Sequence, residues 1–371
     1  MSLSWKRSGA PPVAADLGAT GIRLLQLATE DATMLATAAE HPIAAEAQFS
    51  LDMHLAASSQ AIASIRDNEC WSGRKIIVSM PAPLVSMACV RLESDEDPTF
   101  VAQSRFPELA DDLSIRVVDL PPAGRAPRSG RDVLLLAMSK AAVLQYVEML
   151  HEHRFEVAGV YSPASMMVRA FAHLNRRERD AESATLYMDL DHYGTTVAIG
   201  HGQQLAMARR INAAVALKVA PPKARSETAS PVAAATGQLD QNIVATLNRR
   251  QGGTPPSIAN IQDTPGSSEF HSTNSIDEIV DELQMCMRHH RSLFEHIDFG
   301  RVVFTGAGAS QDGPCRHLAR ALGMPAVVGD PVGQWNCQQT RVDLTDWCRQ
   351  IRPQWTIAAG LTCTADGTHQ S

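Results

Sequence analysis

The sequence predicts an α/β protein made of two similar lobes. Strand-like and helical patterns alternate along the 371 residues, and a chain of this length is expected to form more than one domain. In each half, an apolar strand runs into an aspartate, a tight turn and a second strand. These elements span residues 13–27 and 186–211. A later strand, residues 302–305, ends in the glycine-containing turn 306–308.

The first turn carries residues suited to contact a phosphate. Asp16 lies near the strand end, where a carboxylate can reach a metal-bound water. Gly18 has no Cβ, so backbone N–H groups there can approach phosphate oxygens. The small residues Ala19, Thr20 and Gly21 complete the turn. The same Asp-x-Gly-x-x-Gly pattern is also typical of an ordinary hairpin turn, so both interpretations stay open on this motif alone.

Two aspartate turns, one in each half, followed by a strand and a Gly-x-Gly turn, resemble the actin-like ATPase superfamily. In that superfamily two lobes clamp a nucleotide, and the two turns hold its phosphates. Within it, the chain resembles the PilM family of type IV pilus assembly proteins from about Pro12 to Leu361, with a poorly matching gap near residues 218–275. The strand Lys75–Pro81 and the closing segment Gln354–Leu361 also resemble family elements.

The resemblance implies an actin-like ATPase fold with two similar lobes and a small subdomain inserted in the first. It places the first lobe at residues 1–183, the inserted subdomain at about 84–150, and the second lobe at residues 184–371. In the insert we expect a strand, a short helix interrupted by Pro107, and two further strands.

The resemblance also implies an outer subdomain in the second lobe, at about residues 212–295. Pro, Ser, Thr, Gly, Gln and Asn dominate residues 219–275, which predicts a partly disordered segment with one helical stretch at 238–250. An amphipathic helix is predicted from Ile276 to Phe294, where apolar residues recur at helical spacing.

The resemblance implies a cleft that holds ATP and Mg²⁺ between the lobes. The residues implied to bind the cofactor are Asp16, Gly18, Ala19, Thr20, Gly21, Asp189, Gly194, Thr195, Gly306, Ala307 and Gly308. Asp16 and Asp189 are implied to orient the metal ion and its waters, and no catalytic residue is assigned. Arg23 is set aside, because strand alternation turns it away from the turn.

The second turn departs from the family pattern. The pattern has Asp-x-Gly, whereas Asp191 occupies the glycine position, and Gly194 follows three residues later. A side chain at this position crowds the phosphates, and a second carboxylate repels them. Repulsion between charges ~4 Å apart is worth several kcal/mol at an effective dielectric constant of about 20. We therefore expect weak nucleotide binding and weak or absent hydrolysis.

Composition excludes several other functions. A formal net charge of −7 without a Lys/Arg-rich run argues against general nucleic-acid binding. No apolar stretch approaches the ~20 residues of a membrane helix, and residues 1–10 lack the apolar region of a signal peptide. The seven cysteines are scattered without a Cys-x-x-Cys pair, which is typical of reduced thiols in a cytoplasmic protein. The histidines are predicted to lie on or near the surface.

The resemblance implies a cytoplasmic scaffold of a type IV pilus or type II secretion apparatus, peripheral to the inner membrane through its partners. The implied partner is a PilN-like bitopic inner-membrane protein, whose N-terminal cytoplasmic peptide would lie in a groove of the first lobe beside the insert. The alternative is a small-molecule kinase of the same superfamily. A filament-forming protein is a third possibility, and self-association stays open.

Overall fold

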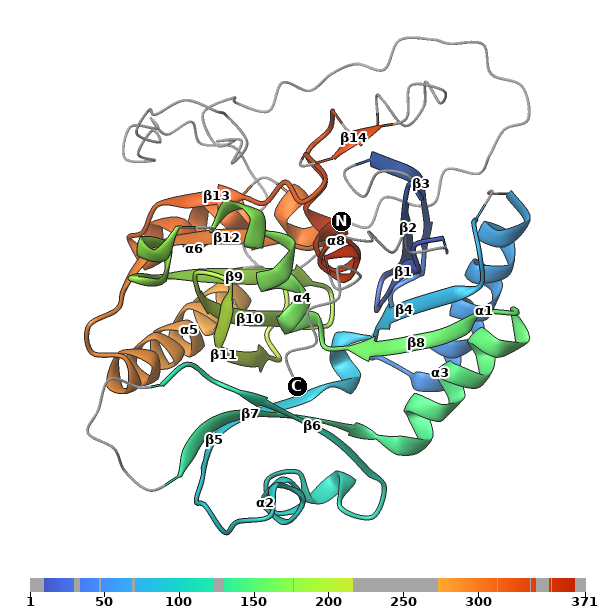
Figure 1. The fold of residues 1–371 in the computed structure, drawn as a ribbon. Coiled ribbons are helices and arrows are strands. Elements are labelled where there is room, and N and C mark those ends of the chain that lie inside the picture. Colours follow the sequence, from blue (N-terminus) through green and yellow to red (C-terminus); the bar gives the residue numbers. More distant parts are fainter. Residues whose placement is uncertain are drawn as a thin grey trace, which may run out of the picture.

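The computed structural model describes residues 10–29, 34–46, 48–68, 71–122, 130–175, 177–215, 273–311, 313–333, 335–337, 347 and 349–363. Figure 1 shows the fold along the chain. The helical stretch predicted at 238–250 lies outside the described residues, as does most of the predicted outer subdomain. Among the described residues, no helix is both long enough and apolar enough to cross a membrane.

A six-stranded sheet forms the base of the first lobe. Its order is β14 (Asn336–Cys337), β3 (Met34–Pro42), β2 (Gly21–Leu27), β1 (Val13–Gly18), β4 (Lys75–Ser79) and β8 (Glu156–Tyr161). Strands β1, β2 and β3 are antiparallel, and β4 runs parallel to β1. Helices α1 (Leu51–Asn68) and α3 (Lys140–Glu152) pack beside each other on one side of the sheet, while α8 (Thr356–Thr362) packs against β1, β2 and β4 on the other (Figure 1).

The second lobe repeats this plan with five strands. Their order is β11 (Gln204–Ile211), β10 (Gly194–His201), β9 (Ser183–Asp191), β12 (Asp298–Thr305) and β13 (Ala326–Val328). In both lobes, an aspartate-bearing strand pairs antiparallel with the next strand and parallel with a later one. Helices α5 (Thr273–Leu293) and α6 (Pro314–Leu322) contact each other in this lobe.

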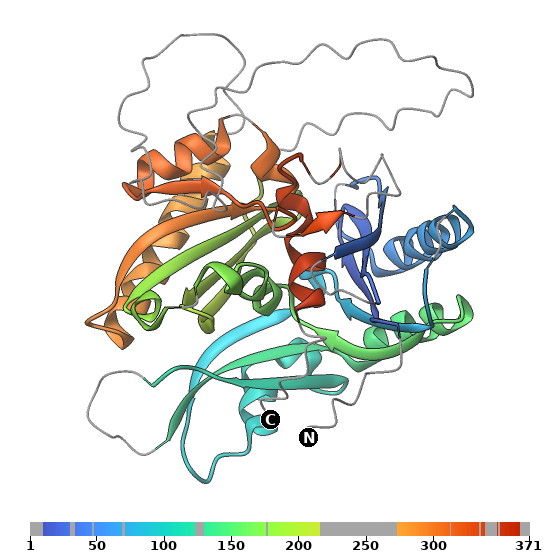
Figure 2. The ribbon, with the colours of Figure 1, turned by 45° about the horizontal axis from the view of Figure 1, so that its top comes forward.

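Two helices lie between the sheets and join the lobes. Helix α4 (Pro163–Ala170) packs on β10, and α8 contacts both α4 and the first-lobe sheet (Figure 2). The two helices meet backbone to backbone, because a Cβ on Gly360 would lie 2.1 Å from the carbonyl oxygen of Met166. Any larger residue at position 360 would therefore force the helices apart.

The inserted subdomain has the predicted order of strand, helix, strand and strand. Strand β5 (Ser86–Leu92) is followed by α2 (Pro98–Arg105), β6 (Leu113–Asp119) and β7 (Arg131–Ser139), and the sheet order is β5-β7-β6. Helix α2 covers an apolar cluster of this sheet. Strand β5 also contacts β11 of the second lobe, where the Cys89 thiol lies 3.8 Å from the Ala208 carbonyl oxygen.

Short 3₁₀ turns complete the described structure: η1 (Ala82–Leu84), η2 (Pro107–Leu109), η3 (Ala172–Leu174), η4 (Glu178–Ala181), η6 (Ala307–Ser310) and η7 (Pro353–Trp355). Ser162 and Pro163 are residues that favour the start of a helix, and α4 begins there, with the Ser165 N–H donating to the Ser162 hydroxyl. It ends at Ala170, however, where η3 takes over, because Phe171 leaves the helical conformation with φ −111° and ψ 11°.

The prediction of surface histidines is wrong for a pair in the second lobe. His201 on β10 and His290 on α5 are buried, and their Nε2 atoms lie 2.7 Å apart. One ring donates its proton to the other, so the pair satisfies part of its own hydrogen bonding. Phe294 packs against both rings. Burial lowers the pKa of each imidazole to about 4, which keeps the pair neutral near pH 7.

Candidate functional site

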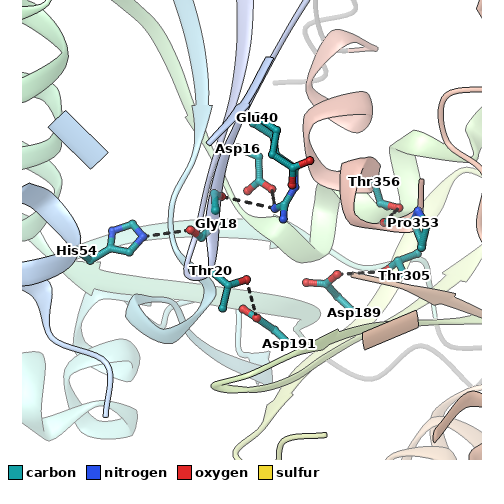
Figure 3. A network of polar contacts seen from close by, with 12 residues as sticks. Asp16, Gly18, Thr20, Glu40, His54, Asp189, Asp191, Thr305, Pro353 and Thr356 are labelled. Carbon is teal, nitrogen blue, oxygen red and sulfur yellow. Dashed lines mark hydrogen bonds and ion pairs between the residues drawn. The ribbon is translucent and has the colours of Figure 1, made fainter. Parts of the chain in front are cut away.

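Three charged side chains line up across neighbouring strands of the first lobe. Asp16 on β1 lies opposite Arg23 on β2, which lies opposite Glu40 on β3. Residues paired in antiparallel strands point to the same face, so these side chains meet. The Arg23 Nη1 lies 3.4 Å from Asp16 Oδ2, and its Nε donates to Glu40 Oε1 at 2.8 Å (Figure 3). We call these three residues the charged row.

Arg23 is therefore a site residue that the sequence argument set aside. Strand alternation counted from the turn alone directs Arg23 away, whereas the tight turn pairs Gly18 with Gly21 and so brings residue 23 opposite residue 16. The Arg23 guanidinium lies against the turn itself, within hydrogen-bonding distance of the Gly21 carbonyl oxygen. A positive group thus lies at the turn where a phosphate contact was predicted.

Asp16 is ionised only with difficulty in this place. Its pKa is raised to about 7, mainly by burial; Arg23 acts in the opposite direction, and the nearby carboxylates of Asp189 and Asp191 contribute to the rise. Burial also opposes the charge on Arg23, but Glu40, Asp16 and Asp191 together raise its pKa above the ordinary value. The groups around Asp16 and Arg23, which are Glu40, Asp189 and Asp191, are all carboxylates. A further cation or a proton would therefore offset the excess of negative charge.

The second aspartate turn faces the first where the two lobes meet. The carboxylates of Asp189 and Asp191 both face the first turn in Figure 3. Asp189 accepts a hydrogen bond from the Thr305 hydroxyl at 3.3 Å. Burial and, after it, the charge of Asp191 raise the pKa of Asp189 to about 6. The two predicted metal ligands are thus close enough for the charge of Asp189 to help raise the pKa of Asp16.

Asp191 bridges the two lobes directly. Its Oδ1 accepts a hydrogen bond from the Thr20 hydroxyl at 3.2 Å and another from the His192 N–H at 2.7 Å. Arg210 lies behind this turn and donates to the Tyr193 carbonyl oxygen at 2.6 Å. The side chain that departs from the family pattern therefore occupies the space between Thr20 and the second turn.

The glycine corner after β12 lies at the back of this group. Gly306 has φ +81°, and a Cβ there would lie 2.5 Å from Asp189 Oδ1 and 2.6 Å from the Leu190 carbonyl oxygen. Only glycine fits both the conformation and the space. Ala307 and Gly308 follow in η6, next to η7. The three predicted turns therefore converge, with the corner against the second aspartate turn.

Thr195 lies apart from this group. It pairs with Leu190, whose side chain is in the second-lobe core, and its hydroxyl donates to the Ala213 carbonyl oxygen at 3.3 Å. Thr196 pairs with Asp189 instead and shares its face. Gly194 closes the turn with φ +135°, pressed against β11. Ala19 is buried in the first turn beside Thr20.

His54 supports the first turn from behind and carries no sequence signal of this role. Its Nε2 donates to the Gly18 carbonyl oxygen at 3.0 Å, so its Nδ1 must accept the hydrogen bond from the Tyr146 hydroxyl at 2.6 Å. Burial lowers the pKa of His54 and favours this neutral form. The carbonyl of Gly18 is thereby fixed by a buried residue of α1.

The carboxylates suit a divalent cation in charge but not yet in coordination. Among the described residues, no three His, Cys, Asp or Glu side chains are arranged to hold a metal ion. Asp16, Asp189 and Asp191 each already have a partner in the protein. Oxygen donors are what Mg²⁺ prefers, and it commonly keeps several waters between itself and carboxylates. These oxygen donors are of the kind that could hold a Mg²⁺ ion through its waters, although the described residues do not form a coordination site as they stand.

Comparison with known proteins places the fold. No protein-family model matches the sequence, and no curated protein matches it. The structure is similar to a solved "PilM-PilN type IV pilus biogenesis complex", with a TM-score of 0.63 and 14% sequence identity over 96% of this chain and 98% of that chain. The chain has the actin-like ATPase fold, with two similar lobes and a small subdomain inserted in the first.

Two further solved structures resemble the chain more loosely. One is a Bacteroides thetaiotaomicron protein with an actin-like ATPase fold and unknown function, with a TM-score of 0.47 and 8% identity over 94% of this chain and 100% of that one. The other is a polyphosphate/ATP-glucomannokinase from Arthrobacter sp. strain KM, with a TM-score of 0.41 and 12% identity over 96% of this chain and 98% of that one. A shared fold at such identities does not assign an activity.

Replacing Arg23 by methionine tests the charged row. Methionine leaves the buried Asp16 without its positive partner, so we expect the free energy of unfolding to fall by about 3–5 kcal/mol. Urea unfolding at a pH of about 8, where Asp16 is mainly ionised, measures the change. The Asp16→Asn/Arg23→Met double variant should regain part of the loss. Equal losses with and without Asp16→Asn would show that the ion pair is not the cause.

Replacing Gly306 by alanine tests the glycine corner. We expect the free energy of unfolding to fall by about 3 kcal/mol, because a Cβ combines an unfavourable φ with a collision at Asp189. Gly323→Ala is the matched control, since Gly323 has φ +62° but nothing within 4 Å of the added Cβ. It should cost about 1 kcal/mol. Similar losses in the two variants would mean that conformation alone matters.

Proposed function

We propose that the chain is a PilM-like scaffold of a type IV pilus or type II secretion-type assembly platform. The observation that carries this proposal is the inserted subdomain between β4 and α3, in a chain whose whole length resembles the PilM of a solved pilus complex. The insert reaches from the first lobe to β11 of the second. This layout supports a protein that presents surfaces to partners and holds a nucleotide cleft.

The lobes at residues 1–183 and 184–371 would then be the two bodies of the scaffold, although β14 and α8 of the later residues pack with the first-lobe sheet. The proposal includes an insert at about 84–150 and an outer subdomain at about 212–295. The protein would be cytoplasmic and would meet the inner membrane only through its partner. That partner would be a PilN-like bitopic protein with a cytoplasmic N-terminal peptide.

The edge strand β8 is where we place the partner peptide. Within the described chain, β8 has β4 as its hydrogen-bonded neighbour and ends the sheet order on that side. An extended peptide can add to such an edge through main-chain hydrogen bonds, with side chains giving specificity. Val160 on β8 is 41% exposed, an apolar contact beside that edge. The insert returns to this sheet through α3, which packs on β8.

The cleft would bind ATP with Mg²⁺, and weakly. Asp16 and Asp189 would hold the ion through its waters, and the turns at Gly18–Gly21 and Gly306–Gly308 would approach the nucleotide. The bound ion would supply positive charge to the phosphates. The Asp191 carboxylate and its hydrogen bond to Thr20 would compete with a phosphate for the same donor.

A small-molecule kinase is the second candidate, and one observation favours it. Burial and neighbouring charge raise the pKa of Asp189 to about 6, close to the value that suits a general base near neutral pH. A kinase would release ADP in the presence of one sugar or carboxylic acid from a panel, and Asp189→Asn would abolish that release. If no acceptor in the panel raises ADP release above background, the scaffold is left as the function.

Peptide binding tests the scaffold. We expect the purified chain to bind one synthetic peptide among the cytoplasmic N-termini of bitopic proteins encoded beside it, as measured by calorimetry. Val160→Lys should weaken that binding about tenfold or more, because a charge replaces an apolar contact at the edge. Met285→Lys is the matched control, since Met285 is equally exposed, at 41%, on α5 of the second lobe. Binding of none of the peptides would count against the proposal.

Replacing Asp191 by glycine tests the cleft. We expect the affinity for ATP with Mg²⁺ to rise about tenfold or more, because the change removes a side chain and a repelling charge. Calorimetry on the two proteins measures the difference. Asp191→Asn separates charge from size and should give an intermediate affinity. Unchanged affinity in both variants would show that the carboxylate does not limit nucleotide binding.

A further inference from the structure

The turn between β9 and β10 touches the first lobe at two separate points. At one, Asp191 accepts the hydrogen bond of the Thr20 hydroxyl at 3.2 Å (Figure 3). At the other, the Tyr193 phenolic oxygen accepts a hydrogen bond from the Glu46 N–H at 2.8 Å. The Tyr193 ring also lies edge-on to Phe49, with ring centres 5.5 Å apart. Both contacts join the two lobes, so separating the lobes must break both.

The two contacts act on the same structural unit of the first lobe. Phe49, which Tyr193 touches, packs against the His54 ring with ring centres 5.2 Å apart. His54 in turn holds the Gly18 carbonyl oxygen. Asp191 therefore holds the first turn at Thr20 on its cleft side, while Tyr193 supports it from behind through Phe49 and His54.

The contact at Thr20 has the chemistry of a phosphate contact. An ionised carboxylate oxygen, like a phosphate oxygen, is a strong anionic acceptor for a hydroxyl hydrogen bond. Asp191 brings this acceptor from the second lobe to the hydroxyl of the first turn. The two turns are thereby connected by a group that belongs to the chain.

We propose that Asp191 and Tyr193 form a latch that holds the lobes together without a nucleotide, with the Asp191 carboxylate in the place of a phosphate. The proposal deepens the proposed nucleotide cleft by naming what governs its closure. A ligand that carries a phosphate must displace Asp191 from Thr20 before both turns can bind that phosphate. Closure of this chain is then a default state, and nucleotide binding competes with it.

The test follows the latch in the absence of nucleotide and partner. Hydrogen exchange is measured by mass spectrometry on peptides covering residues 16–24 and 43–50, and the radius of gyration by small-angle X-ray scattering. In Asp191→Ala we expect about tenfold faster exchange in residues 16–24 and a larger radius of gyration, since one hydrogen bond of typical strength is lost. In Tyr193→Phe the faster exchange should appear at the Glu46 amide, which loses its acceptor.

Matched variants separate the latch from a general loss of stability. Asp191→Asn keeps an oxygen that can accept from Thr20, so it should exchange like the wild type. Asp330→Ala removes another partly buried carboxylate, which accepts a hydrogen bond within its own loop, and should leave both peptides unchanged. Asp191→Ala and Thr20→Val combined should have no larger effect than either alone, because both remove one bond. Wild-type exchange in Asp191→Ala, or additive effects in the pair, would overturn the latch.

Chemical rescue tests the phosphate role. Inorganic phosphate, used as the probe, should restore slow exchange in Asp191→Ala but not in Asp191→Ala/Thr20→Val, which lacks the hydroxyl donor. Absence of rescue would overturn the claim that the Asp191 carboxylate takes the place of a phosphate. Rescue of both variants would overturn it as well, because phosphate would then act at a place other than Thr20. Neither measurement involves the partner peptide or ATP, so failure here is distinct from failure of the PilM-like function.

Discussion

A buried guanidinium between two carboxylates fixes the side of the first lobe that faces the second aspartate turn. Arg23 joins Asp16 on one neighbouring strand to Glu40 on the other, and both Asp16 and Arg23 are more than nine-tenths buried. Charges removed from water are tolerated only where their partners are in place. The charged row therefore holds β1, β2 and β3 in one register, since a slip of one residue would turn each side chain to the opposite face.

The balance of charge around this row determines what the cleft can accept. Asp16, Asp189 and Asp191 face two guanidinium groups, those of Arg23 and Arg210, and the pKa values of Asp16 and Asp189 rise to about 7 and about 6. Raised values mean that the carboxylates gain from added positive charge. A bare phosphate would add to the repulsion, whereas a phosphate that arrives with a divalent cation would not. The same imbalance explains why a hydroxyl, that of Thr20, is a suitable partner for Asp191.

The sequence predicts that the two aspartate turns and the glycine corner come together, but it does not predict the side-chain contacts around them. Asp16 lies near the end of β1, Asp189 lies near the end of β9, and Gly306 directly follows β12, so each stands at the end of a strand, a placement that a motif can reveal. Arg23 could also have been found, because a turn that pairs residue 18 with residue 21 pairs residue 16 with residue 23. The same count places Thr196, not Thr195, opposite Asp189.

Other features have no local signal in the chain. His54 reaches Gly18 only because α1 packs behind the first turn, and Tyr193 reaches Glu46 only because the lobes meet. Strand β3 escapes a periodicity search, since its alanine-rich pattern is weakly apolar although it pairs with β2 along most of its length. Elements fixed by tertiary contact, rather than by propensity or turn chemistry, are the ones that the sequence leaves undetermined.

The register of the first-lobe sheet also relates the cleft to the edge where we place the partner. Asp16 pairs with Ser79 on β4, and Ser79 pairs with Tyr161 on β8. Paired positions thus lead from the charged row, through Ser79 and Tyr161, to the edge strand itself. A peptide added at β8 would bind a sheet whose central strands are held by buried ion pairs. Communication between edge and cleft would then require movement of the sheet as a body against the second lobe. The contacts of Asp191 and Tyr193 are among those that oppose such movement, because both cross from one lobe to the other.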